Sequence, residues 1–140
     1  MIPKFRAWHI DKQIMCEVIR IDFKQGIVTL DLEPDDDEYY WTETDWKTSH
    51  VSLMQSTGLK DRNGVEIYEG DIITWESPEM TQSTWIGTVF RNGAEFSVRK
   101  SKKTYSTGAW LNSACRPTNN IITVIGDIHQ NQELLEASDD

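Results

Sequence analysis

The chain has 140 residues and a formal net charge of −9, and 38% of its residues are hydrophobic. This length suits one ordinary domain, or one compact domain with an accessory β subdomain. The negative charge argues against a general affinity for phosphate backbones, because the long-range field of the protein repels them.

Residues 1–53 are predicted to form an N-terminal β meander with an acidic loop. Residues 4–10 alternate polar and apolar side chains, as a half-buried strand does, and a turn leads into a second strand candidate at 14–23. Another tight turn precedes a third candidate at 27–30. The strand candidates follow one another without an intervening helix, so we expect a meander and not a βαβ unit.

Acidic residues accumulate between positions 31 and 46, a segment that contains no lysine or arginine. The part from 33 to 38 cannot bury itself and is expected to be a solvated loop. Its aspartates are adjacent and no glycine follows them, so the calcium-binding EF-hand pattern fails. We therefore expect neither a metal ion nor a cofactor.

Residues 54–130 are predicted to form a small SH3-like β-barrel. Turns are expected at 61–64 and 69–71, where Asp and Asn side chains can bind nearby backbone groups and glycine can adopt positive φ. An Asn-Gly hairpin signal follows at 91–94. The strands expected around these turns cover residues 72–75, 85–90 and 95–99.

Asp61 and Asp71 are expected to accept hydrogen bonds from backbone N–H groups of their turns. The alternative is a paired-carboxylate acid–base site, which requires Asp61, Asp71 or Glu69 to converge in a cleft. Their spacing does not demand it. The histidines are dispersed, and nucleophile-elbow, phosphate-loop and dinucleotide motifs are absent from the sequence. The sequence therefore predicts no enzyme.

The remaining elements complete a mainly β fold. Residues 102–111 are predicted as a strand, and the β-branched residues of 121–128 predict a closing strand. Asn131 is expected to cap a brief helix at 132–136. The segment 131–140 is thus a short helix with a frayed tail.

Other sequence features concern burial and compartment. Most of the six tryptophans are expected in the core or half buried on strands, with an aromatic nucleic-acid platform as the alternative. The N-terminus lacks the apolar core of a secretory signal, and no stretch approaches the length of a membrane span. We therefore expect a cytoplasmic protein without membrane contact, in which Cys16 and Cys115 are buried free thiols.

Motifs similar to those of the YopX family occur in order along nearly the whole chain. They are KFRAW at 4–8, QSTGLKDRNG at 55–64, IYEGDII at 67–73, GTV at 87–89, VIGDIHQN at 124–131 and ELL at 133–135. The resemblance implies a phage or prophage protein of a Gram-positive host with an SH3-like barrel component. It brings no catalytic residues and no established function.

The leading hypothesis is a phage-encoded cytoplasmic binding or adaptor module that acts on an unidentified host or phage protein. Small barrels expose loops and short edge strands that suit docking. The segregated charges mark two candidate surfaces, the acidic loop and a basic stretch that begins at Arg91. The candidate partner-binding residues are Asp35, Asp36, Asp37, Tyr39, Tyr40, Trp41, Arg91, Arg99, Lys100, Lys102 and Lys103.

Three alternatives stay open. The basic stretch could bind nucleic acid, with Tyr105 or Trp110 stacking on bases, although the net charge disfavours this. The protein could be a homo-oligomer in which acidic and basic faces of neighbouring copies meet. The charge segregation could also serve solubility alone. Binding that weakens steeply with salt would indicate nucleic acid, and sedimentation at rising salt tests the oligomer.

Overall fold

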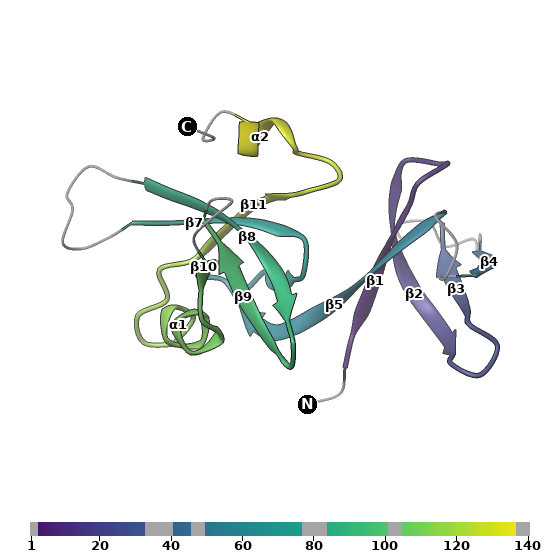
Figure 1. Ribbon diagram of the computed structural model, residues 1–140, viewed down its shortest axis with the longest axis horizontal. Coiled ribbons are helices and arrows are strands. Elements are labelled where there is room, and N and C mark those ends of the chain that lie inside the picture. The colour runs from purple at the N-terminus through teal and green to yellow at the C-terminus, as the bar shows by residue number, and fades with distance from the viewer. Residues whose placement is uncertain (1–2, 33–40, 46–49, 77–83, 101–104, 137–140) are drawn as a thin grey trace. The chain divides into compact units, whose positions relative to one another are not determined.

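The computed structural model describes residues 3–32, 41–45, 50–76, 84–100 and 105–136. Within these residues the fold is mainly β, with two antiparallel sheets and two short helices (Figure 1). The chain divides into two compact units, unit 1 (Met1–Gln55) and unit 2 (Ser56–Asp140). Strand β5 (Val51–Lys60) begins in unit 1 and ends in unit 2. The predicted mainly β class is confirmed.

Unit 1 is an antiparallel meander, as predicted. Its strands are β1 (Phe5–His9), β2 (Ile14–Asp22), β3 (Ile27–Asp31) and β4 (Trp41–Asp45), and the sheet order is β4-β3-β2-β1-β5. The turn between β2 and β3 has a local cause, because Asp22 Oδ1 accepts the backbone N–H groups of Lys24 and Gln25. The buried core of this unit consists of Ala7, Cys16, Val28, Leu30 and Val51.

Unit 2 contains a sheet with the order β10-β9-β8-β7-β11, while its short strand β6 (Glu66–Tyr68) pairs with β5. The sheet strands are β7 (Asp71–Glu76), β8 (Thr84–Asn92), β9 (Glu95–Arg99), β10 (Tyr105–Ser106) and β11 (Thr123–Asp127). Helix α1 (Gly108–Ala114) lies beside β9, as Figure 1 shows. The core of the unit includes Ile67, Ile73, Val89, Val98, Leu111 and Ile122. The strand orders describe open sheets, so the SH3-like barrel stays a prediction.

The predicted hairpin between β8 and β9 is confirmed. Asn92 pairs directly with Glu95, which leaves Gly93 and Ala94 as a two-residue loop. Gly93 has a φ of 66°, a conformation that costs glycine no Cβ clash. Such tight turns match the twist of the flanking strands.

The strand predicted over residues 102–111 is wrong beyond Ser106. Residues 102–104 of this prediction lie outside the described residues, β10 covers Tyr105–Ser106, and α1 begins at Gly108. Thr107 caps this helix, since its side-chain oxygen accepts the backbone N–H of Trp110 at 3.3 Å. Leu111 and Ala114 of the helix are buried in the unit 2 core. The helix thus combines a local cap at Thr107 with the burial of Leu111 and Ala114.

The predicted C-terminal helix is confirmed as α2 (Glu133–Glu136), but the predicted cap is wrong. The Asn131 side chain does not cap the first turn of α2. Its Oδ1 atom instead accepts the backbone N–H of Asp127 at 3.1 Å. Gly126 makes room for this contact, since an added Cβ there would lie 2.5 Å from Asn131 Oδ1. In the part of the chain that the structure describes, neither helix combines the length and apolarity needed to cross a bilayer.

Candidate functional site

The carboxylate of Asp61 is buried and accepts three backbone N–H groups. Its Oδ1 atom accepts those of Asn63 and Val65, and its Oδ2 atom accepts that of Val124, each at 2.9 Å. A buried charge in this position is stabilised by charge-assisted hydrogen bonds, which are stronger than neutral ones. The prediction that Asp61 binds the amides of its turn is confirmed, and the contact with Val124 adds a distant strand.

Asp71 and Asp127 lie directly opposite each other on β7 and β11, and both are buried. Asp71 Oδ2 accepts the backbone N–H of Tyr68 at 2.8 Å. Asp127 Oδ1 accepts the N–H groups of His129 and Gln130, and its Oδ2 accepts the side-chain amide of Gln130. These carboxylates fix chain reversals, which is a structural role. The predicted amide contact of Asp71 is confirmed.

The acidic group of predicted contact residues lies mostly outside the described residues. This holds for Asp35, Asp36, Asp37, Tyr39 and Tyr40. Trp41 is the first residue of β4, an edge strand of its sheet, where it pairs with Asp31. Among the residues that the structure does describe, no group of three or more His, Cys, Asp or Glu side chains could hold a metal ion.

The described basic residues extend to different faces of the unit 2 sheet. Side chains alternate along a strand, so Arg99 points away from the face of buried Val98, and its guanidinium lies 4.6 Å over the Phe90 ring. Lys100 extends to the other face of the sheet, the face on which the side chains of Val98 and Trp75 lie next to Gly87. Arg91 is exposed on β8. Lys102 and Lys103 lie outside the described residues.

Three tryptophans from three elements surround the ammonium group of Lys100. The Lys100 Nζ atom lies 5.8 Å from the ring centroid of Trp75, 5.7 Å from that of Trp85 and 5.6 Å from that of Trp110. A cation within about 6 Å of an indole face is attracted by the ring quadrupole. Trp75, Trp85 and Trp110, called the Trp cluster below, form the candidate site.

Strand register and one ring contact bring the Trp cluster together. Trp75 on β7 and Trp85 on β8 are directly opposite cross-strand partners. Trp110 on α1 meets Trp75 edge to face, with ring centroids 4.9 Å apart and an interplanar angle of 61°. Such geometry is favourable beyond simple burial. The cluster is therefore a formed structure and not a chance exposure of indoles.

Gly87 and Thr107 help to position two rings of the Trp cluster, Gly87 that of Trp75 and Thr107 that of Trp110. A Cβ added at Gly87 would lie 3.1 Å from Trp75 Cη2 and 2.5 Å from Val98 Cγ1, so only glycine leaves room for the indole to lie across β8. Thr107 fixes the first turn of α1 through the Trp110 N–H. The resulting site is graded in exposure, because Trp75 is 5% exposed whereas Trp85 is 39% exposed.

The sequence prediction named Lys100 as a contact residue but missed the tryptophans around it. Trp75 is buried as expected, and Trp110 is partly buried, as expected for most tryptophans. Their convergence depends on the register that places Trp75 opposite Trp85 and on a helix where a strand was predicted. The sequence did offer one signal, because Trp75 and Trp85 stand near the facing ends of two successive predicted strands and could be expected to pair.

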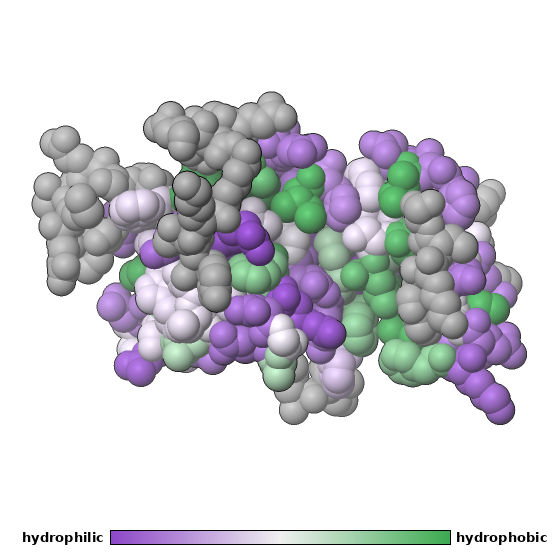
Figure 2. Space-filling model, viewed as in Figure 1, coloured by the Kyte–Doolittle hydropathy of each residue, from purple (hydrophilic) through white to green (hydrophobic). Residues whose placement is uncertain are grey.

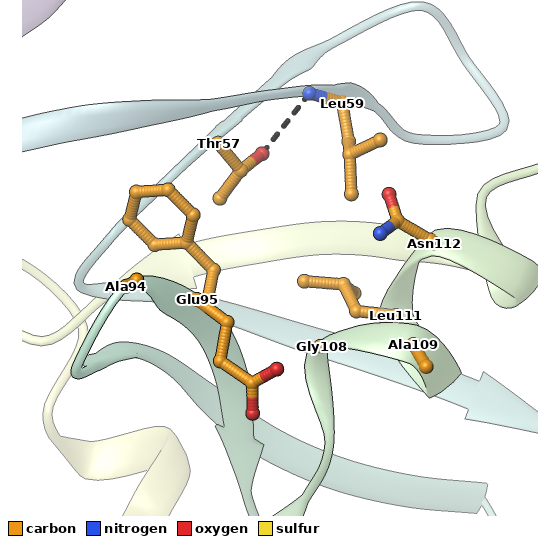
Figure 3. A pocket seen from close by; sticks show the side chains of 9 residues that line it. Thr57, Leu59, Ala94, Glu95, Gly108, Ala109, Leu111 and Asn112 are labelled. Atoms are coloured by element: carbon orange, nitrogen blue, oxygen red, sulfur yellow. Dashed lines mark hydrogen bonds between the residues drawn. The ribbon is translucent and has the colours of Figure 1, made fainter.

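A pocket of about 350 Å³ also opens in unit 2, between the second half of β5, the tip of the β8–β9 hairpin and α1 (Figure 3). Of the residues that line it, Glu95 is the titratable one. The Thr57 hydroxyl is engaged, since it donates to the Ile67 carbonyl and accepts the Leu59 N–H, the bond drawn in Figure 3. The pocket therefore offers neither an activated nucleophile nor a pair of acid–base groups among the described residues.

Both cysteines are buried and free, as predicted. Burial raises the pKa of the Cys115 thiol to about 11, and the negative charge of Asp61 adds to this effect. Burial also raises the pKa of Cys16, with a further contribution from Asp31. Because the thiolate is the reactive form, neither group is poised as a nucleophile near neutral pH.

Large apolar side chains are exposed at several points of each unit. Figure 2 shows hydrophobic residues as green areas among hydrophilic ones on the visible face. Single exposed apolar residues are normal on a protein surface. Exposed Trp85 differs from these single residues because its ring and two further indoles lie around the same Lys100 ammonium group. Among the residues that the structure describes, the exposed large hydrophobic ones are Ile10, Ile19, Phe23, Val65, Trp85 and Ile125.

The fold and the Trp cluster define a mainly β protein in which three indoles lie around the ammonium group of its own Lys100. The family model described as YopX protein matches residues 4–136, so the chain belongs to the YopX family. Among solved structures, protein EF1440 from Enterococcus faecalis is similar, with 26% sequence identity and a TM-score of 0.64. The similarity covers 96% of this chain and 99% of that one. The comparison with curated proteins gave no match.

Proposed function

We propose that the protein is a non-catalytic binding module, encoded by a phage or prophage, that docks on a partner protein in the host cytoplasm through the Trp cluster. The observation that carries this proposal is the convergence of three indoles on one point with Trp85 39% exposed. Tryptophan is enriched among the residues that dominate binding energy at protein interfaces. A rigid indole also loses little conformational entropy when it is covered.

Charge favours a protein partner with a basic surface. The chain carries a formal net charge of −9, which attracts positive patches and repels nucleic-acid backbones. In addition, Arg99 and Lys100 extend to opposite faces of the sheet, so these two residues do not line one groove for a phosphate backbone. These features argue for the protein-binding hypothesis over the nucleic-acid alternative.

The absence of catalysis is part of the proposal. The three buried aspartates Asp61, Asp71 and Asp127 have backbone amides as hydrogen-bond partners. Within the described residues, the side-chain partner of Glu95 in the pocket is the Ser97 hydroxyl, which donates at 3.4 Å. General acid–base catalysis requires a group positioned beside a reacting atom, usually with a second group that tunes it. The described contacts provide no such pair.

We also propose that unit 2 is an SH3-like barrel. In support, β7, β8 and β9 form a continuous antiparallel meander, β11 pairs with β7, and β5 pairs with β6 next to it in sequence. A small barrel exposes its loops and short edges for docking while its interior stays packed. The Trp cluster lies where the end of β7 and the start of β8 approach α1.

The test compares the protein with two single variants as bait in a lysate of a Gram-positive host. Trp85→Ala removes the exposed indole, and Val65→Ala removes another exposed apolar side chain, 49% exposed, as a matched control. Partners held by the wild-type protein and by Val65→Ala should be lost with Trp85→Ala. Circular dichroism establishes that both variants fold.

Retention of every partner by a folded Trp85→Ala protein would overturn the proposed binding surface. Binding of single-stranded DNA at low salt, with an affinity that falls steeply as salt rises, would favour the nucleic-acid alternative instead. Sedimentation of a large species that dissociates at high salt would favour the homo-oligomer.

A further inference from the structure

We propose that the Trp cluster is a receptor for an arginine side chain of the partner, and that Lys100 occupies this receptor when the partner is absent. This inference rests on the proposed binding function and specifies the chemistry of the ligand. It makes Lys100 an internal competitor, which is displaced when the arginine enters.

The geometry of the site is that of a receptor for a cation. Rings from β7, β8 and α1 lie at nearly equal distances, 5.6 to 5.8 Å, from a single ammonium nitrogen. Aromatic side chains grouped around one point are a known means of binding organic cations, because each ring face carries negative potential. The side chain that already lies there identifies the class of ligand that the site accepts.

Lys100 is suited to be displaced. It is exposed and follows the last residue of β9, on a flexible four-carbon stem. Within the part of the chain described by the structure, its polar head makes no ion pair or hydrogen bond, and its contacts there are the three rings. Exposed cation–π contacts are individually weak, so a competing cation can replace the Lys100 ammonium group.

Arginine is the better competitor for physical reasons. Its guanidinium is planar and weakly hydrated, so it loses less solvation than an ammonium group when it lies against an indole. Elsewhere in the protein Arg99 lies 4.6 Å over the Phe90 ring, whereas Lys100 lies 5.6 to 5.8 Å from the rings of the cluster.

The experiment follows the six indole N–H signals of the protein by NMR, assigned by single Trp→Phe variants. The probes are three capped tripeptides, Gly-X-Gly, in which X is arginine, lysine or citrulline. Citrulline has the shape of arginine without its charge. The arginine peptide should shift the signals of Trp75, Trp85 and Trp110, the lysine peptide should bind more weakly, and the citrulline peptide should leave the signals unchanged.

Variants test the role of Lys100. Lys100→Ala should bind the arginine peptide roughly threefold to tenfold more tightly, because removing the occupant raises the fraction of competent sites. Trp85→Ala should bind it roughly fivefold more weakly, as the loss of about 1 kcal/mol implies. Val65→Ala should behave as the wild-type protein does. Lys100→Ala removes no core side chain, so it stays informative even if Trp85→Ala fails to fold.

Several outcomes would overturn the inference. Equal binding of arginine and citrulline would exclude cation recognition, and an unchanged affinity in Lys100→Ala would exclude Lys100 as the competitor. If arginine peptides fail to bind while partner capture still depends on Trp85, the arginine inference fails and the proposed function stands. If capture is independent of Trp85 as well, both fail.

Discussion

The Oδ2 atom of Asp61 accepts the backbone N–H of Val124 at 2.9 Å, although the two residues are 63 positions apart in sequence. The Oδ1 atom of the same carboxylate accepts two amides of its own turn. One buried side chain thus fixes the turn after β5 and joins it to the edge strand β11. Such a group is costly to alter, because an amide left without an acceptor in the interior loses its hydration without compensation.

Replacing Asp61 by Asn should destabilise the protein by about 1–3 kcal/mol. The asparagine oxygen can keep the bonds to Asn63 and Val65, but its NH2 group then faces the Val124 N–H, and two donors oppose each other. Urea unfolding measures the loss as a lower midpoint.

The matched control is Asp22→Asn. Asp22 uses a single oxygen to accept the N–H groups of Lys24 and Gln25, and the site is exposed. Asparagine can reproduce both bonds, so the free energy of unfolding should change by no more than about 0.5 kcal/mol. Equal effects at the two positions would refute the role assigned to the Val124 contact.

Gly87→Ala should destabilise unit 2 and disturb the Trp cluster. The new methyl group would overlap Val98 Cγ1 and press on Trp75, and a β8–β9 pair in mid-sheet has little room to move. Overpacking of this kind costs about 1–3 kcal/mol. The diagnostic measurement is near-ultraviolet circular dichroism, which should lose intensity from the coupled indoles.

Gly93→Ala separates crowding from backbone strain. No atom lies within 4 Å of a Cβ built at Gly93, but its φ of 66° is unfavourable for alanine. The variant should therefore lose about 1 kcal/mol of stability and keep the indole spectrum of the wild-type protein. A matching spectral change in both variants would contradict the assignment of Gly87 to the packing of Trp75.

The thiol of Cys115 should make the protein less stable as pH rises through the alkaline range. Its pKa is about 11 in the folded protein, raised from an ordinary value of 9.0. Between these values the unfolded chain loses a proton that the folded chain retains, so stability is complete below about pH 9 and declines toward pH 11. Urea unfolding across this range should show a smaller decline for Cys115→Ala than for the wild-type protein. Parallel curves would refute this contribution.

Loss of the Thr107 cap should weaken α1 and loosen the Trp cluster. Thr107→Ala removes the acceptor of the Trp110 backbone N–H and should lower the free energy of unfolding by about 1 kcal/mol. Thr107→Ser keeps an oxygen at the same position and should restore most of this loss. The Trp110 indole signal in NMR provides the second measurement, and it should move in the alanine variant only.

The sequence by itself determined the elements that depend on neighbouring residues. The hairpin at Gly93, the Asx contacts of Asp22 and the turn amides bound by Asp61 all follow from side chains that act within a few positions of their own backbone. The motif order along the chain likewise indicated the YopX family, which the match over residues 4–136 confirms.

Only the tertiary structure decided which distant residues meet. The segment around Trp110 forms a helix because Leu111 and Ala114 are buried in the unit 2 core, an interaction that no local pattern contains. The register of β7 and β8 sets Trp75 opposite Trp85, and Gly87 leaves the space that Trp75 fills. Because the free energy of such packing depends on partners far apart in sequence, the site around Lys100 emerges from the fold and not from any motif.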